Sequence, residues 1–504
     1  MDRQKYEMLV WSLQGEAHDE PGAFHTRVLM ISMTAYLVLF GMLSLSLLSL
    51  LFLWKASSSA VYVKYLLVTW LVALVPILWM LLRMFFMRIH PPEERELTEA
   101  EAPKLFEMIE ELRKRVQGAP VHHVLITNEF NASVLQHPRF GMFGGYRNYL
   151  ILGLPMLYAV SAEEFKGILA HEYGHLAGGH GKIYRWIGRQ RDTFGLLYDH
   201  AMKRREDNWI NGVIAGMLEW FWPYFSAYTF VLNRQQEYEA DAVATSVVGA
   251  QAAASALVRT DLLDGWLHNN FWKKMYEQAS QHAKPPFMPY VSMGKLLAVT
   301  MDEWATKERL NRAWKLDSDT QDTHPCLRER LTAMEQHAAL PGMVKVNAAD
   351  ALLGKFALTL ARELDEKWWD AEKTNWQSYH RRYTRSIERI AELEQKPLQE
   401  LSVMDAQELG LLLFEFRTLE AAKVVLQSLV KRPGERFPKP LFYYGRVLLS
   451  EDNEIGLDYL KEACALAPSM WDDCARTGYQ WLCANRSEAT AEDWLQRMCK
   501  QAEE

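Results

Sequence analysis

The sequence predicts a predominantly α-helical α+β fold with a small β-sheet. Two long uncharged runs predict an amino-terminal pair of membrane-spanning helices, since each run can cross a hydrocarbon core of ~30 Å. Short segments rich in β-branched residues predict the sheet, and helical periodicity beyond about residue 347 predicts a helical carboxy-terminal region. These observations divide the chain into segments 1–27, 28–88, 98–345 and 348–504.

Composition restricts the class of protein. The 504 residues are 49% hydrophobic and 24% charged, which is typical of a folded chain. A net charge of −7 supplies no basic field, so nucleic acid is not an expected partner. The five cysteines are odd in number and show no Cys-x-x-Cys spacing, so we expect free thiols in a reducing compartment.

The two uncharged runs extend from Val28 to Trp54 and from Tyr65 to Leu82. They predict a two-span hairpin in a lipid bilayer rather than a cleaved signal peptide, because 27 residues precede the first run. Basic residues flank both outer ends, which favours two cytoplasmic ends. We therefore expect a multi-pass protein of the cell inner membrane whose main body is cytoplasmic. The flanking residues are Arg3, Lys5, Arg27, Arg83, Arg88 and Arg95.

The central body begins with an expected helix over 100–116. Strands are expected over 121–127 and 149–152, the second after a glycine-rich turn that contains Gly141, Gly144 and Gly145. Ser161 and Glu164 have the spacing of a capping box, so a helix should begin there and continue into the next motif.

That helix contains His171, Glu172 and His175 in the order His-Glu-x-x-His. Histidines four residues apart lie on one helical face, so both imidazoles can bind one metal ion. Glu172 is then placed to accept a proton from a metal-bound water and to act as general base. A surface helix with two solvated histidines is the alternative.

A catalytic zinc usually has a third protein ligand. A metzincin would have histidine six residues after His175, but that residue is Gly181 and the nearest histidine is His180. The better candidate is Glu237, which shares a helical face with Asp241 at spacing i, i+4. Asp241 could accept the second N–H of a histidine ligand and fix its tautomer.

The paired motifs His171-Glu-Tyr-Gly-His175 and Glu237-Tyr-Glu-Ala-Asp241 resemble those of the HtpX and CAAX prenyl protease family of membrane-associated zinc metallopeptidases, which are gluzincins. Residues His324-Pro325, with Arg330 six residues after the histidine, resemble a third element of that family. The resemblance covers residues 100–335.

The resemblance implies a gluzincin-type peptidase domain with one zinc ion per chain and protein or peptide substrates. It implies that His324 enters the active site, where it either stabilises the oxyanion or caps the zinc in a resting state, and that Arg330 orients the site. Residues 128–132 resemble the family's edge strand for substrate. Asn233 replaces the family's usual serine, and an asparagine can still cap a helix start.

The segment from Trp209 to Leu232 is apolar and aromatic but contains Asn211, Glu219 and Pro223. A single span here would separate the two zinc-ligand helices, so we expect a buried or membrane-dipping helical hairpin beside the cleft.

The carboxy-terminal region has a repeat at an offset of 35 residues, which pairs Gly410 with Gly445 and Pro433 with Pro468. This spacing is close to the tetratricopeptide period and predicts a tetratricopeptide-like array that binds a protein partner. A nonrepetitive helical domain is the alternative.

The sequence therefore predicts a membrane-anchored zinc endopeptidase in membrane-protein or misfolded-protein quality control. The alternative is a membrane-tethered scaffold or chaperone with a structural or latent zinc site. A prenyl-protein processing enzyme has no support outside the zinc motifs.

Overall fold

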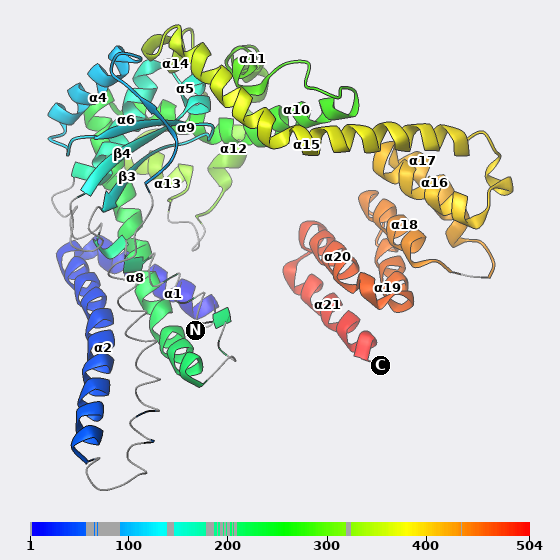
Figure 1. Cartoon of the computed structure of the whole chain (residues 1–504), viewed down its shortest axis with the longest axis horizontal. Helices are drawn as coiled ribbons and strands as arrows, with labels where there is room; N and C mark the ends of the chain where they lie inside the picture. Colours follow the sequence, from blue (N-terminus) through cyan, green and yellow to red (C-terminus); the bar gives the residue numbers. More distant parts are fainter. Residues whose placement is uncertain are drawn as a thin grey trace. The chain divides into compact units, whose positions relative to one another are not determined.

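The structure is a computed structural model of the 504-residue chain. It describes residues 3–56, 65, 68, 91–138, 146–177, 186–188, 190–191, 195, 198, 202–203, 205, 209–318, 324–434 and 436–503. Contacts divide the chain into two compact units, which Figure 1 colours along the sequence. The first unit comprises residues 1–273 and 287–370, and the second comprises 274–286 and 371–504.

The first unit contains a four-stranded sheet in the order β1-β2-β4-β3 (Figure 1). Its strands are β1 (Arg95–Leu97), β2 (His123–Thr127), β3 (Ala132–Pro138) and β4 (Tyr146–Gly153). Strands β2 and β4 are parallel, whereas β1 and β3 are antiparallel to their neighbours and form the two edges. The prediction of a small sheet is confirmed; the glycine turn predicted at Gly141, Gly144 and Gly145 lies outside the described residues.

Helices α4 (Pro103–Arg115) and α6 (Ala162–Ala177) pack against each other beside this sheet. Leu105 and Leu112 of α4 are fully buried, as are Leu150 and Leu152 of β4. The capping box at the start of α6 forms as expected, because the Glu164 backbone N–H donates to Ser161 Oγ and the Ser161 N–H donates to Glu164 Oε2.

Helix α8 (Trp209–Val248) is one continuous helix of 40 residues. The expected hairpin over Trp209–Leu232 is therefore wrong, and Asn233 lies inside the helix rather than at its start. All residues between Pro223 and Asn233 are helical, and the Thr229 hydroxyl donates a hydrogen bond to the Phe225 carbonyl one turn earlier. The aromatic segment 209–232 and the expected third ligand Glu237 thus lie on the same helix. Helix α9 (Ala250–Trp266) follows it after Gly249.

Two helices precede the sheet, α1 (Arg3–Asp19) and α2 (Pro21–Ala56). Phe24 of α2 and Phe230 of α8 share a buried cluster with α1. The first uncharged run lies in α2, whereas the second run, apart from Tyr65 and Val68, lies outside the described residues, as do Arg83 and Arg88. Among the residues that the structure describes, no helix has the length and apolarity of a membrane span. The two-span hairpin stays a prediction.

Further helices complete the first unit, and one of them, α13 (Leu327–Ala333), carries Arg330 of the site. The others are α5 (Leu154–Ala159), a π-helix (Leu267–Trp272), α11 (Pro289–Trp304), α12 (Lys307–Lys315) and α14 (Ala348–Leu352). Helix α10 (Lys273–Glu277) and a 3₁₀ turn (Gln278–Ser280) follow the π-helix, and α15 (Phe356–Leu393) begins in the first unit and ends in the second.

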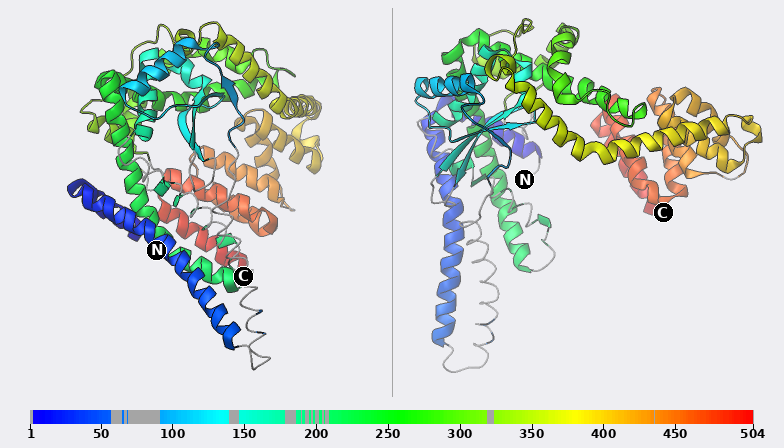
Figure 2. Two further views of the ribbon diagram at one scale, coloured as in Figure 1. Left: turned by 60° about the vertical axis from the view of Figure 1, so that its left-hand side comes forward. Right: turned by 45° about the horizontal axis from the view of Figure 1, so that its top comes forward.

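The second unit consists mainly of six helices that pack in chain order, and Figure 2 shows them in orange and red. They are α16 (Val403–Phe416), α17 (Leu419–Val430), α18 (Pro438–Ser450), α19 (Gly456–Leu466), α20 (Trp471–Asn485) and α21 (Glu488–Glu503), with 3₁₀ turns at Leu398–Glu400 and Pro468–Met470. Gly410, Gly445 and Gly478 each lie where the first helix of a pair closely approaches the second. The tetratricopeptide-like assignment stays a prediction.

Candidate metal centre

Helix α6 presents both histidines of the His-Glu-x-x-His motif on one face. His171 and His175 are one turn apart, and their Nε2 atoms lie 3.2 Å from each other. The capping box fixes the start of the helix, so the position of both rings along it is set by the local sequence.

Helix α8 brings Glu237 to the same point. Glu237 Oε2 lies 3.6 Å from His171 Nε2, and Oε1 lies 3.5 Å from His175 Nε2. One ligand atom from each of the three residues lies within 4.8 Å of the other two. The structure therefore brings together the three side chains that the sequence analysis selected from two distant segments.

A close approach of the two helices makes this meeting possible. A Cβ atom added to Gly174 would lie 2.7 Å from the Ala240 Cα, which is too close for any side chain. Gly174 of α6 and Ala240 of α8 thus allow backbone contact between their helices. Sequence analysis missed this pair, although a glycine between the two motif residues Glu172 and His175 was a usable signal.

The three residues fit a zinc ion. Ligand atoms about 2.1 Å from a tetrahedral ion lie about 3.4 Å from one another, and the observed separations of 3.2, 3.5 and 3.6 Å are close to this spacing. Two imidazoles and one carboxylate form a common donor set of catalytic zinc sites. Glu237 is buried, and its two carboxylate oxygens face one histidine nitrogen each, Oε2 that of His171 and Oε1 that of His175.

Asp241 and Arg330 support the His171 ligand. The His171 Nδ1 atom lies 2.9 Å from Asp241 Oδ1, so its N–H can donate there and leave the Nε2 lone pair facing the other ligands. Arg330 donates to both oxygens of Asp241, over 2.8 Å from Nε and 2.6 Å from Nη2. The Arg330 guanidinium therefore fixes the carboxylate that orients the imidazole.

The protonation of the two histidines differs in the metal-free protein. Burial lowers the pKa of His175 to about 4, and the charge of His171 acts in the same direction. For His171 burial also acts to lower the pKa, but the hydrogen bonds to Asp241 and Glu237 outweigh it and raise the pKa to about 9. A metal must therefore displace a proton from His171, whereas His175 is already neutral.

Glu172 lies beside the edge strand β3. Burial, with the charge of Glu237 as a further cause, raises the pKa of Glu172 to about 7, and the Val134 backbone N–H donates to its carboxylate. A carboxylate with a pKa near neutrality is suited to exchange protons. The edge strand of the site is β3 (Ala132–Pro138); the expectation of residues 128–132 is corrected, because pairing with β4 begins at Ala132.

His324 contacts the site from the segment that precedes α13 rather than from α6 or α8. Its Nδ1 atom lies 3.1 Å from Glu237 Oε2, and its side chain is 63% exposed. Thr323, just before it, lies outside the described residues. The segment after His324 is held by Glu329, which accepts hydrogen bonds from Arg234 and Ser318.

This Arg234–Ser318–Glu329 group was missed by sequence analysis. Ser318 Oγ also accepts from the Cys326 backbone N–H at 2.8 Å, so one hydroxyl fixes both sides of the segment that carries His324. Arg234 directly follows Asn233, but its partners Ser318 and Glu329 lie 84 and 95 residues away, so no local pattern indicated the group.

A small cavity of about 190 Å³ is lined by two of the three ligands, His171 and Glu237, and by Glu172. Its wall away from the ligands is apolar and built mainly from small residues of α6, α8 and α9. These wall residues include Gly167, Ile168, Ala244, Ala253, Ala256 and Leu257.

Comparison with known families gives one match. The model of peptidase family M48 matches residues 101–338, just under half of the chain, and this range contains all seven of the residues selected for the site. No protein of curated function matches the chain.

Proposed function

We propose that the chain is a zinc endopeptidase of protein quality control, because residues 101–338 match the model of peptidase family M48, a family of zinc-dependent metallopeptidases. The observation that carries the proposal is the convergence of His171, His175 and Glu237, with Glu172 on the same helix as the two histidines. A structural zinc site would have no use for a general base, which argues against a purely structural metal.

Each residue of the site has a separate role in the proposed hydrolysis of a peptide bond. A zinc ion held by His171, His175 and Glu237 would polarise the scissile carbonyl and lower the pKa of water. Glu172 accepts the proton from the attacking water and then delivers it to the leaving amine. His324, beside Glu237, is placed to donate a hydrogen bond to the oxyanion.

Strand β3 supports an extended binding mode for the substrate. It is an edge strand, paired only with β4 among the described strands, and its Val134 N–H donates to the Glu172 carboxylate. A peptide that added to this edge would pass directly beside the general base. The apolar cavity next to the ligands would then receive one of its side chains.

Substitution Glu172→Gln tests the proposal. We expect proteolysis of unfolded casein to fall by about 10²- to 10⁴-fold, the usual contribution of a general base, while one zinc per chain remains bound. Activity measured with and without a chelator, together with the zinc content of each protein, gives both readouts.

The matched control is Glu163→Gln, an exposed glutamate at the start of the same helix, which should leave both readouts unchanged. An active Glu172→Gln protein would contradict the peptidase assignment. Loss of zinc together with activity would instead assign Glu172 a role in holding the metal.

We propose further that the chain is anchored in a bacterial-type inner membrane with its peptidase domain cytoplasmic. The uncharged runs Val28–Trp54 and Tyr65–Leu82 and their basic flanks support this attachment. Resistance to alkaline carbonate extraction would agree with anchoring, and release into the soluble fraction would contradict it. Protease accessibility of the carboxy-terminal helices from each side would test the orientation.

The second candidate function is a scaffold that recruits proteins through the six carboxy-terminal helices. Its specific support is Arg446, whose guanidinium lies 4.9 Å from the Phe414 ring centroid and 5.8 Å from that of Tyr443. Among the described residues Arg446 makes these ring contacts and no ion pair, so its charge is available to an acidic partner. Arg446→Glu should reduce casein binding by the Glu172→Gln protein if the array recruits substrate.

A further inference from the structure

A second and much larger cavity lies in the first unit, away from the metal centre. Its volume is about 900 Å³, within the range of about 300 to 1,000 Å³ that is usual for small-molecule sites. It shares no lining residue with the cavity beside the metal ligands. Helices α5 and α9 separate the two, because Met156 and Thr260 face the metal side while Tyr158 and Leu263 face the large cavity.

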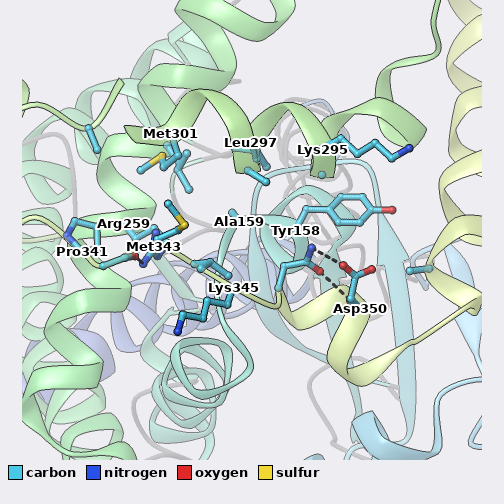
Figure 3. A pocket seen from close by; sticks show the side chains of 18 of the residues that line it. Tyr158, Ala159, Arg259, Lys295, Leu297, Met301, Pro341, Met343, Lys345 and Asp350 are labelled. Atoms are coloured by element: carbon cyan, nitrogen blue, oxygen red, sulfur yellow. Dashed lines mark hydrogen bonds between the residues drawn. The ribbon is translucent and has the colours of Figure 1, made fainter. Parts of the chain in front are cut away.

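The walls of this cavity are mainly apolar. Figure 3 shows Leu297 and Met301 of α11 on one side, with Ala159 and Met343 opposite them. Met343 lines the cavity and is 68% exposed, so the cavity is open to solvent beside this residue. Further apolar lining comes from Leu263, Val291, Leu340, Val344, Ala357 and Leu358.

The charged residues that line the cavity are unbalanced. Lys295, Lys345 and Lys355 are exposed lining residues, and within the described part of the chain none of them makes a hydrogen bond or ion pair. In Figure 3 Lys295 and Lys345 extend from different sides of the cavity. Three uncompensated ammonium groups around an apolar space favour an anion.

The two other charged residues that line the cavity, Arg259 and Asp350, already form hydrogen bonds within the protein. Arg259 donates from Nε to Glu164 and from Nη2 to the Gly342 carbonyl, so it fixes the wall and contributes little net charge. Asp350 is the one acidic lining residue, and its Oδ2 accepts from the Asn347 amide at 2.9 Å (Figure 3). The net charge of the lining is therefore positive.

We propose that this cavity binds a single long-chain anionic amphiphile, a fatty acid in chemical class, with its chain among the apolar walls and its carboxylate among the lysines. The apolar walls can bury a hydrocarbon chain, and the lysines can pair with an anionic head group. A wholly polar anion would leave the apolar walls exposed to water and gain nothing from them. The proposal is independent of the peptidase activity, since it uses no residue of the metal centre.

Titration of the full chain with monomeric oleate, followed by displacement of a fluorescent fatty acid, tests the site. We expect saturable binding of one oleate per chain. Octanoate and decanoate should differ in affinity by about fifteenfold, because they differ by two methylenes and each buried methylene contributes a factor of roughly four. The uncharged alcohol of the same length should bind more weakly than oleate, and a long-chain amine should not bind.

Two variants localise the binding. Ala298→Trp places a large side chain at an exposed lining position and should abolish displacement. The pair Lys295→Glu and Lys345→Glu should weaken oleate binding at least tenfold and leave the alcohol unchanged. The matched control is Lys307→Glu, an exposed lysine of α12 that does not line the cavity.

Other outcomes would overturn the proposal. Oleate affinity that is equal in wild type, Ala298→Trp and the double lysine variant would place binding elsewhere. Binding of phosphatidylglycerol vesicles without binding of monomeric oleate would show a membrane-docking face instead of a ligand site. Circular dichroism and casein hydrolysis of each variant separate a lost site from a misfolded protein.

Discussion

Asp241 acts on the metal through His171 rather than by contact with the ion. Its carboxylate lies beside Nδ1 of the His171 imidazole and accepts hydrogen bonds from Arg330. We expect Asp241→Asn to lower the affinity for zinc by about 10- to 100-fold, the usual effect of such supporting groups. Competition with a chromogenic chelator measures this affinity directly.

Glu239 provides the control for that measurement, because it lies on the same helix and is exposed. Glu239→Gln should bind zinc as wild type does. Unchanged zinc affinity in Asp241→Asn would show that Arg330 or the backbone suffices to orient His171.

Gly174 is the residue on which the approach of α6 to α8 depends. Alanine usually stabilises a helix by about 1 kcal/mol relative to glycine. At Gly174, however, the new Cβ would lie 2.7 Å from the Ala240 Cα, and such overpacking costs about 1 to 3 kcal/mol. We therefore expect Gly174→Ala to lower the unfolding free energy and to weaken zinc binding at least tenfold.

The same substitution at Gly216 of α8 is the matched control, since no described atom lies within 4 Å of its added Cβ. Gly216→Ala should raise the unfolding free energy and leave zinc binding unchanged. Chemical denaturation with zinc titration distinguishes the two positions. Equal responses would show that the helices can separate without disturbing the ligands.

Helix α11 is joined to α15 by one buried carboxylate, that of Asp365. Asp365 is 3% exposed and accepts from the Tyr290 N–H at 2.7 Å and from the Val291 N–H at 3.1 Å. Burial raises the pKa of Asp365 to about 6, although both N–H donors act to lower it. The carboxyl group thus binds a proton more tightly in the folded chain than in the unfolded chain.

The sign of the pH effect follows from that difference. The stabilisation by the protonated Asp365 is fully present below pH 4 and is lost as the pH rises through about 6. Relative to Asp365→Asn, the wild-type unfolding free energy should fall by roughly 2 to 3 kcal/mol between pH 4 and pH 7. Denaturation at several pH values measures both proteins, and a difference independent of pH would refute the raised pKa.

Local signals predicted the elements with strong patterns. The Ser161–Glu164 spacing located the start of α6 because a capping box acts within four residues. Strand β2 was located by its β-branched residues, and β4 by its position after the glycine-rich segment. Strand β1 and most of β3 were missed, since both are edges and contain polar residues such as Arg95 and Gln136, which resemble a loop in sequence.

The long helix α8 shows where sequence reasoning fails. Its polar residues and Pro223 suggested a hairpin, but a proline removes one N–H and does not by itself reverse the chain. For the site, the motifs selected His171, His175 and Glu237, whereas the Gly174–Ala240 contact depends on tertiary packing. Gly174 was a local sign that another element approaches α6 closely, but no local spacing identifies Ala240 as its partner.

The two compact units of the chain have separate cores. The metal ligands lie entirely in the first unit. Zinc binding should therefore raise the unfolding temperature of the first unit alone. At a free zinc concentration of 100 times the dissociation constant the gain is about 2.7 kcal/mol, which corresponds to a rise of about 3 to 6 °C.

Differential scanning calorimetry with zinc and with a chelator should resolve this effect, and Gly478→Ala identifies the other transition. An added Cβ at Gly478 would lie 2.2 Å from the buried Trp494 ring, so this variant should lower the unfolding temperature of the second unit. We expect zinc to shift one transition and Gly478→Ala to shift the other. A single transition that responds to both changes would show that the two units unfold as one cooperative structure, because the continuous helix α15 then transmits the stabilisation between them.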